Sequence, residues 1–203
     1  QTGVRAHFCR LSTNRALHMI ARARHEGLAV TCDVAVHHLY LTEVDILDFD
    51  SACHLIPPLR SDRDRDGLRN GLNRHILDAI CSDHQPHEPD AKQAPFSETE
   101  PGLSGLDTLL PLVIRLADEG VLSLSDALAR VTAAPADILG LASGRLGKGA
   151  PADVCVFDPK ASWFVSPETL HSRGHNTPFT GWEMIGRATQ ILVGGRLVFD
   201  ASK

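Results

Sequence analysis

The first 81 residues alternate between short apolar runs and a helix-like segment, and this order constrains the fold more than any other feature. Residues 4–9 and 28–36 have the apolar character of buried strands. Between them, residues 16–23 carry apolar side chains at helical spacing, with Ser12 as the expected cap and Gly27 as the expected end of the helix. Because a strand–helix–strand unit pairs its strands in parallel through a right-handed crossover, this region predicts a parallel sheet covered by helices.

The alternation continues through the middle of the chain. A charged helix is expected over residues 62–72 and a third apolar strand over residues 76–81. Residues 40–60 and 88–104 are polar or contain proline and show no periodicity, so irregular segments are expected there. The helix start and stop signals that follow predict three helices, at residues 106–119, at residues 124–132 and from Pro135 onward. Three strand units cannot close a barrel, which needs about eight strands, so the pattern indicates the last part of a larger (β/α) barrel.

The character of the chain changes after Gly140, where glycines interrupt it repeatedly. Strands are expected at residues 152–157 and within residues 189–199, with the pair Gly194-Gly195 as a hairpin turn. These features predict a small β-rich domain over residues 145–203, which follows the predicted barrel segment at residues 1–144.

Composition excludes several classes of protein. With 43% hydrophobic residues and a formal net charge of −5, the chain has the balance of a folded globular protein and no electrostatic reason to bind nucleic acid. No apolar run is long enough to span a bilayer and no signal peptide opens the chain, so we expect a cytoplasmic protein. The five scattered cysteines include no C-x-x-C pair and predict free thiols. The chain opens with Gln1 just before a strand, which suggests a fragment whose N-terminal half lies elsewhere.

The strongest local signal for chemistry is the segment 82–87 (SDHQPH), which directly follows an apolar strand. In a parallel barrel the carboxyl ends of the strands carry the active site. There, Asp83 can ligate a metal and take a proton from metal-bound water, and His87 lies within reach of a substrate. The alternative is that Asp83 caps the following turn and that both histidines of the segment are solvated. The pattern alone leaves both interpretations open.

Other histidines give weaker signals. His7 and Cys9 share one strand face, and a packed or hydrogen-bonded His7 is favoured over a ligand. His37 and His38 point to opposite faces if extended, so one structural and one exposed histidine are favoured. The acidic and basic run at residues 62–66 is typical of a solvated helix face. No partner is predicted for the remaining histidines His18, His25, His54, His75, His171 and His175.

Several segments, in order, resemble the class I dihydroorotases, the cyclic amidohydrolases of pyrimidine synthesis. The segment DHQPH resembles the family motif D-H-x-P-H, and VAVHHLYL and PPLR resemble its E-V-T-P-H-H-L-x-L and N-P-P-L-R motifs. Further matches are APFSETEPGLSG, GRLGKGAPADVCVFDP and NTPFTG, which extend the similarity over nearly the whole chain.

The resemblance implies an α/β fold in which residues 1–144 form the C-terminal part of a (β/α)8 TIM-type barrel. Residues 145–203 would then belong to a β-sandwich built from both chain ends. It also implies a zinc centre that activates water to open the dihydroorotate ring. Asp83 would be the catalytic proton shuttle and a metal ligand, and His87, Pro101 and Gly102 would line the substrate pocket.

Two departures from the family pattern bear on activity. Arg10 stands where the family has a ligand histidine, and a guanidinium offers no lone pair and repels a divalent cation. Ile56 stands where the family has a substrate-binding asparagine. The pattern resembles the non-catalytic dihydroorotase homologues found beside aspartate carbamoyltransferase. We therefore expect zinc to be absent or weakly bound, no small-molecule substrate, and an oligomer that includes the protein's N-terminal half and aspartate carbamoyltransferase.

Two other functions stay open. One is an active zinc-dependent dihydroorotase whose remaining ligands lie in the N-terminal half, where an intact H-x-H motif would decide for it. The other is a different cyclic amidohydrolase, such as a relative of the hydantoinases, against which the DHQPH and PPLR segments argue.

Overall fold

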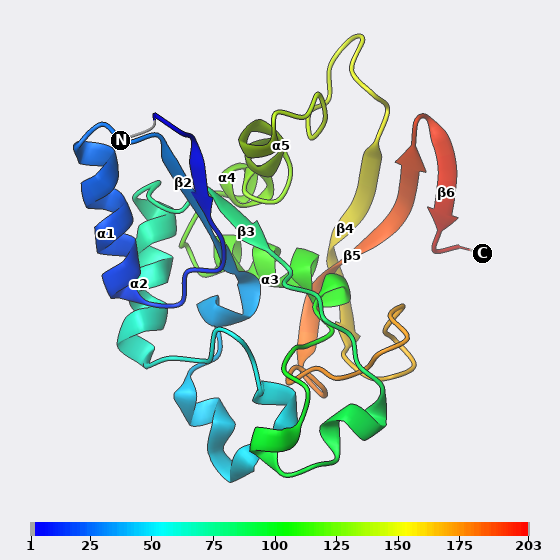
Figure 1. The fold of residues 1–203 in the computed structure, drawn as a ribbon. Helices are drawn as coiled ribbons and strands as arrows, with labels where there is room; N and C mark the ends of the chain where they lie inside the picture. Colours follow the sequence, from blue (N-terminus) through cyan, green and yellow to red (C-terminus); the bar gives the residue numbers. More distant parts are fainter. Residues whose placement is uncertain (1–2, 203) are drawn as a thin grey trace.

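The computed structural model describes residues 3–202, which form two three-stranded sheets with helices packed around them. The first sheet is parallel in the order β1-β2-β3, and helices α1 and α2 connect its strands on one side (Figure 1). This confirms the α/β class and the parallel sheet predicted from the alternation. The bounds are β1 Ala6–Phe8, α1 Asn14–His25, β2 Val30–Ala35, α2 Asp62–Asn73 and β3 Ala79–Cys81.

The cap of helix α1 lies one residue later than predicted. The cap is Thr13, in an extended conformation, and its hydroxyl accepts a hydrogen bond from the Ala16 amide at 3.1 Å. The prediction of Ser12 as the cap was therefore wrong, because the first helical residue is Asn14 and the residue before it, Thr13, makes the cap hydrogen bond. The predicted end near Gly27 is confirmed, since Gly27 has a positive φ of 82° just beyond the last turn.

The two segments predicted to be irregular contain short 3₁₀ turns and no strand or α-helix. In the first, η2 and η3 come before the Pro57-Pro58 pair, and a further turn, η1, lies just ahead of this segment, directly after β2. In the second, η4 and η5 come before Pro101. The bounds are η1 Val36–Leu39, η2 Glu43–Phe49, η3 Ser51–Cys53, η4 Pro89–Lys92 and η5 Phe96–Glu98.

Three helices lead from the parallel sheet to a second, antiparallel sheet of order β4-β5-β6. Gly194 and Gly195 form the predicted turn between its last two strands. Strands β4 and β5 are longer than expected, because register shifts after Val156 and Asp158 let the ladder continue past Pro159. The bounds are α3 Leu106–Asp118, α4 Leu124–Ala129, α5 Ala133–Leu139, β4 Val154–Phe164, β5 Glu183–Val193 and β6 Arg196–Asp200.

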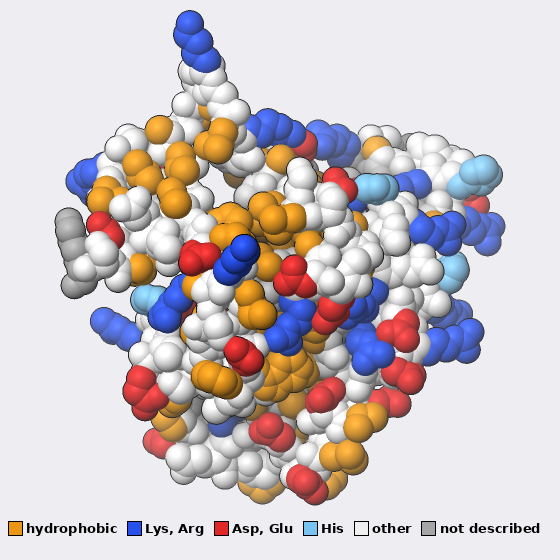
Figure 2. All heavy atoms as spheres, turned by 180° about the vertical axis from the view of Figure 1, so that it is seen from behind, with side chains coloured by type: hydrophobic (Ala, Val, Ile, Leu, Met, Phe, Trp, Pro, Cys, Tyr) orange, Lys and Arg blue, Asp and Glu red, His pale blue; other side chains and the backbone are white. Residues whose placement is uncertain are grey.

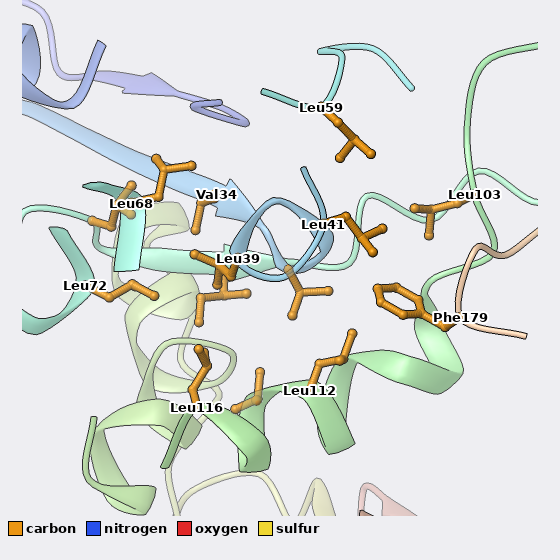
Figure 3. Close-up of a cluster of buried hydrophobic side chains, with 14 of the residues drawn as sticks. Val34, Leu39, Leu41, Leu59, Leu68, Leu72, Leu103, Leu112, Leu116 and Phe179 are labelled. Carbon is orange, nitrogen blue, oxygen red and sulfur yellow. The ribbon is translucent and has the colours of Figure 1, made fainter. Parts of the chain in front are cut away.

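The main core lies between the parallel sheet and helix α3 (Figure 3). Leu112 and Leu116 of α3 point toward Leu39, which η1 places just beyond the end of β2. All three side chains are fully buried. The other face of α3 meets β5, where a Cβ added at Gly186 would lie 2.3 Å from Cδ1 of Ile114. Helix α3 thus joins the two sheets through opposite faces.

The surface differs between the two parts of the chain. From behind, Figure 2 shows Lys and Arg side chains along the margin where α1 and α2 lie, hydrophobic side chains gathered in the upper and central part of that face, and acidic side chains scattered over its lower part. The charged run at residues 62–66 is mostly exposed, as predicted, although Asp64 accepts a hydrogen bond from the Asn14 amide at 2.9 Å. Several apolar side chains of the antiparallel sheet are exposed, namely Val156, Phe164, Ile185, Val193, Leu197 and Val198.

The three parallel strands do not close into a barrel within residues 3–202. In this range no helix combines the length and apolar character needed to cross a membrane. The boundary at residue 144 and the assignment of the tail to a sandwich stay predictions.

Candidate functional site

The residues predicted for chemistry gather at the carboxyl edge of the parallel sheet. Arg10 lies beyond the end of β1, and Asp83 lies beyond the end of β3. Both residues have positive φ angles, 57° for Arg10 and 45° for Asp83, so the chain turns sharply where each strand ends. The Arg10 Nη1 atom donates to Asp83 Oδ1 at 3.1 Å and to the carbonyl oxygen of Ile56 at 3.3 Å. Asp83 is therefore paired with a guanidinium.

A buried carboxylate that the sequence analysis did not select holds Arg10 in place. Asp33, in the middle of β2, accepts a hydrogen bond from the Arg10 amide at 2.7 Å. The same oxygen, Oδ1, also accepts from the Cys81 thiol at 3.4 Å, and the other oxygen, Oδ2, lies 2.8 Å from His7 Nε2. The second ring nitrogen of His7 lies 2.8 Å from Thr31 Oγ1. The signal that could have found Asp33 is a single acidic residue inside an otherwise apolar strand.

His7, Cys9 and Asp33 each offer one metal-ligating atom, and these atoms all lie within 4.8 Å of one another. The predicted hydrogen-bonded state of His7 is confirmed, since both ring nitrogens have partners. Burial, followed by the negative charge of Asp33, raises the pKa of the Cys9 thiol. Asp83 belongs to no group of three or more such residues within the described part of the chain.

The second part of the site surrounds His87. His87 Nε2 lies 3.0 Å from the carbonyl oxygen of Pro101, so this nitrogen carries the proton in the neutral ring. Asn176, from the C-terminal segment, accepts from the His87 amide at 2.7 Å. Its side-chain nitrogen donates to the carbonyl oxygens of Gly102, at 3.0 Å, and Gln85, at 3.1 Å. Asn176 thus ties three loop segments together, a role the sequence analysis did not assign to it.

Gly102 and Gln85 connect the two parts of the site. A Cβ added at Gly102 would lie 2.6 Å from Cβ of Gln85 and 3.1 Å from Nε2 of His87, so the loops approach as closely as a glycine allows. Gln85 Nε2 donates to Asp83 Oδ1 at 3.3 Å. The structure therefore brings together the predicted residues Arg10, Ile56, Asp83, His87, Pro101 and Gly102. The side chain of Ile56 itself is 61% exposed and contributes its carbonyl oxygen.

The prediction for the histidine pair after β2 was wrong. His37 and His38 are both buried, at 0% and 2% exposure, because η1 rotates successive residues by less than an extended strand does. No described residue lies within hydrogen-bonding reach of either ring nitrogen of His37. Burial, with smaller contributions from the charges of His38 and Arg10, lowers the pKa of His37 well below its usual value. His38 Nε2 lies 3.2 Å from the carbonyl oxygen of Pro58.

Three histidines for which no partner was predicted contact other polar side chains in the structure. His54 lies 2.8 Å from the Thr99 hydroxyl, and His75 lies 2.5 Å from a guanidinium nitrogen of Arg130. His171 lies 2.8 Å from Asp107, at the rim of a cavity of about 470 Å³ between α3 and the antiparallel sheet. Asp83 and Arg10 do not line this mainly apolar cavity.

Polar side chains at the carboxyl ends of parallel strands, with helices as crossovers, define an α/β protein whose site lies at the edge where such folds bind ligands. The chain belongs to the amidohydrolase family, whose sequence model matches residues 2–198.

Individual relatives agree with this assignment. The dihydroorotase-like protein of Pseudomonas aeruginosa is 46% identical over 200 residues, which cover 98% of this chain and 47% of the relative. The dihydroorotase of Syntrophotalea carbinolica is 41% identical over 201 residues, which cover 99% of this chain and 47% of the relative. The solved L-hydantoinase of Arthrobacter aurescens matches with a TM-score of 0.90 at 25% identity, over 98% of this chain and 45% of that one. The chain spans about half the length of these relatives, and the resemblance to dihydroorotases drawn from its motifs is confirmed.

A zinc ion at Asp83, as the family resemblance implies, does not fit the side chains that surround this carboxylate. The oxygen that faces the site already receives hydrogen bonds from Arg10 and Gln85. A zinc ion binds a carboxylate oxygen at about 2.0–2.2 Å and needs about four ligands. Within the described residues, Asp83 is instead accompanied by a cation, so we derive no reaction step through a metal at this position.

Proposed function

We propose that this chain is the C-terminal part of a dihydroorotase-like barrel protein that does not hydrolyse cyclic amides. The observation that carries the proposal is the 3.1 Å contact between Arg10 Nη1 and Asp83 Oδ1. In this arrangement the guanidinium supplies the positive charge that a metal would otherwise supply. Because a guanidinium cannot ligate water or lower its pKa, the pair has no means of generating a hydroxide nucleophile.

Other hydrogen bonds hold Arg10 in the position from which it pairs with Asp83. Its amide is fixed by Asp33 at 2.7 Å, and its guanidinium also donates to the carbonyl oxygen of Ile56 at 3.3 Å. Ile56 offers no side-chain hydrogen bond to a substrate at a position where the family resemblance places an asparagine. Loss of the ligand histidine and loss of the substrate-binding amide therefore act in the same direction.

The role we propose in place of catalysis is that of an assembly partner of aspartate carbamoyltransferase in a cytoplasmic oligomer. The loop clamp centred on Asn176, with four hydrogen bonds to its side chain and backbone, keeps the surface loops ordered without a substrate. The greater identity to dihydroorotase relatives than to hydantoinases supports this family branch over a hydantoinase function.

The catalytic part of the proposal is tested on the full-length protein that contains this chain. We expect no zinc-dependent hydrolysis of dihydroorotate, and we expect the same of an Arg10→His variant, because one restored histidine leaves too few ligands. Calorimetric titration with zinc should show no new tight site in this variant relative to Arg15→His, a control at an exposed position on α1. Measurable zinc-dependent hydrolysis by the unmodified protein would overturn the proposal.

The assembly part is tested by co-expression with the catalytic chain of aspartate carbamoyltransferase and by analytical ultracentrifugation. We expect a stable complex, and we expect an Asp83→Asn variant to form it equally well, because the proposed role needs the scaffold and not the carboxylate. Separate sedimentation of the two unmodified proteins would contradict the proposed partnership.

An active dihydroorotase is the second candidate, and a specific observation favours it. Asp83 is retained, and His87, Pro101 and Gly102 still meet in one pocket wall, with His87 Nε2 lying 3.0 Å from the Pro101 carbonyl. In that case the remaining ligands would come from the other half of the protein and would displace Arg10. An intact H-x-H motif upstream, together with dihydroorotate turnover, would establish this function.

A further inference from the structure

We propose that His7, Cys9 and Asp33 form a binding site for a zinc-type divalent cation, separate from Asp83. The site lies around the end of β1 and the middle of β2, and it uses none of the residues that the family resemblance assigns to the metal centre. It therefore goes beyond the proposed function and does not depend on it.

The three side chains have the chemistry and spacing of a zinc site. Imidazole, thiolate and carboxylate are the ligands that zinc prefers, and their bonds of about 2.0–2.3 Å place ligand atoms roughly 3–4 Å apart. Here the three ligand atoms all lie within 4.8 Å of one another, and His7 Nε2 lies 2.8 Å from Asp33 Oδ2. Small side-chain rotations therefore suffice to place one cation between them. One thiolate and one carboxylate would balance its two positive charges.

The groups behind the ligands are already arranged as they are in zinc sites. A ligating histidine usually donates its other ring N–H to an oxygen, which fixes its tautomer. His7 Nδ1 lies 2.8 Å from Thr31 Oγ1, so it can donate there while Nε2 ligates. Asp33 Oδ1 accepts from the Arg10 amide at 2.7 Å and from the Cys81 thiol at 3.4 Å, which leaves Oδ2 for a cation.

The site is open on one side. Cys9 is exposed, His7 is half-buried and Asp33 is buried, so a cation could enter past the thiol and keep a water molecule as its fourth ligand. Three protein ligands with an open fourth position are the arrangement of zinc sites that stay accessible. The guanidinium of Arg10 is held toward Asp83 and Ile56. The proposed divalent cation would therefore bind Cys9 and Asp33, whereas the guanidinium pairs with Asp83.

The test is a titration of the metal-free full-length protein with Co²⁺, which reports thiolate ligation by an intense near-ultraviolet charge-transfer band. We expect the band to appear at one cobalt per chain and to be abolished in Cys9→Ser, whose exposed position leaves the core intact. Cys155→Ser, also at an exposed thiol, is the matched control and should keep the band. Thr31→Val removes an outer partner alone and should weaken cobalt binding by about 10-fold.

Two results would overturn this inference: absence of the band in the unmodified protein, or its survival in Cys9→Ser. In either case the three residues form a hydrogen-bond network without a metal. An Asp83→Asn variant separates this inference from the proposed function. Retention of the thiolate band in Asp83→Asn supports a separate site. Additional cobalt that lacks the band and is lost in Asp83→Asn would contradict the proposed function and leave this inference standing.

Discussion

Replacing Asp33 by alanine should free the chain around Arg10, and the size of the effect can be worked out from the contacts of this carboxylate. Asp33 is 8% exposed and accepts hydrogen bonds from the Arg10 amide, at 2.7 Å, and from the Cys81 thiol, at 3.4 Å. His7 Nε2 lies 2.8 Å from its other oxygen. The Arg10 amide is the critical partner, because Arg10 is held at a φ of 57°.

The magnitude follows from two terms. A hydrogen bond from a backbone amide to a charged carboxylate contributes about 1.5–3 kcal/mol. The left-handed conformation of a residue with a Cβ costs about 1–2 kcal/mol, which the lost bond no longer offsets. Because water can reach part of the freed groups, we expect a net loss of about 2–4 kcal/mol in the free energy of local opening. Asp33→Asn keeps one acceptor oxygen for the Arg10 amide and should lose about half as much.

The assay is hydrogen exchange measured by mass spectrometry on peptides that contain Arg10. A loss of about 2–4 kcal/mol corresponds to exchange that is roughly 30- to 1,000-fold faster, since about 1.4 kcal/mol is a factor of ten. The control is Asp62→Asn, which removes an exposed carboxylate that accepts from the Arg63 amide at 2.6 Å. This variant should leave exchange at Arg10 unchanged. Unaltered exchange at Arg10 in Asp33→Ala would refute the role assigned to the carboxylate.

Three further predictions concern the rest of the chain. Leu72→Ala, at a fully buried position, should lower the free energy of unfolding by about 3 kcal/mol in urea titrations, whereas Leu106→Ala, at 57% exposure, should lower it by less than about 1 kcal/mol. Gly186→Ala should cost about 1–3 kcal/mol by the same assay, because φ is 103° and the new methyl group would lie 2.3 Å from Ile114 Cδ1; an unchanged midpoint would contradict the close packing of α3 on β5. Burial lowers the pKa of His37, so below pH 6.5 the unfolded state takes up a proton that the folded state does not. The free energy of unfolding should therefore decrease as the pH is lowered below 6.5. In His37→Leu this part of the pH dependence, followed by thermal denaturation, should be flatter.

Much of the fold could be predicted because its signals are local. Apolar runs bounded by glycine and polar residues located every strand of the parallel sheet, and helical spacing located α1, α2 and α3. The lengths of β4 and β5 could not be predicted, since Pro159 and Gly186 normally end strands. Here, register shifts in the ladder accommodate Pro159, and the packing of α3 fills the space above Gly186.

The candidate site was predictable where it follows a motif and unpredictable where it depends on partners distant in sequence. The pairing of Arg10 with Asp83 joins positions 73 residues apart, and the family motifs had placed both residues at the expected metal centre without predicting their contact. Asp33 and Asn176 escaped prediction because their importance lies in the backbone groups that they bind, which the sequence does not identify. His37 and His38 were misassigned because a 3₁₀ turn, and not an extended strand, follows β2.

The two outer strands of the parallel sheet have a consequence for how copies of this chain would meet. Among the described strands, β1 and β3 each pair on one side, with β2, and their outer edges are different surfaces. The outer edge of β3 is partly occupied, because the Ile80 amide donates to the Arg130 carbonyl oxygen at 3.0 Å. A contact between β1 of one copy and β3 of the next would therefore be head-to-tail. Unless its rotation closes a ring, such a contact repeats without limit and produces a fibre instead of a dimer.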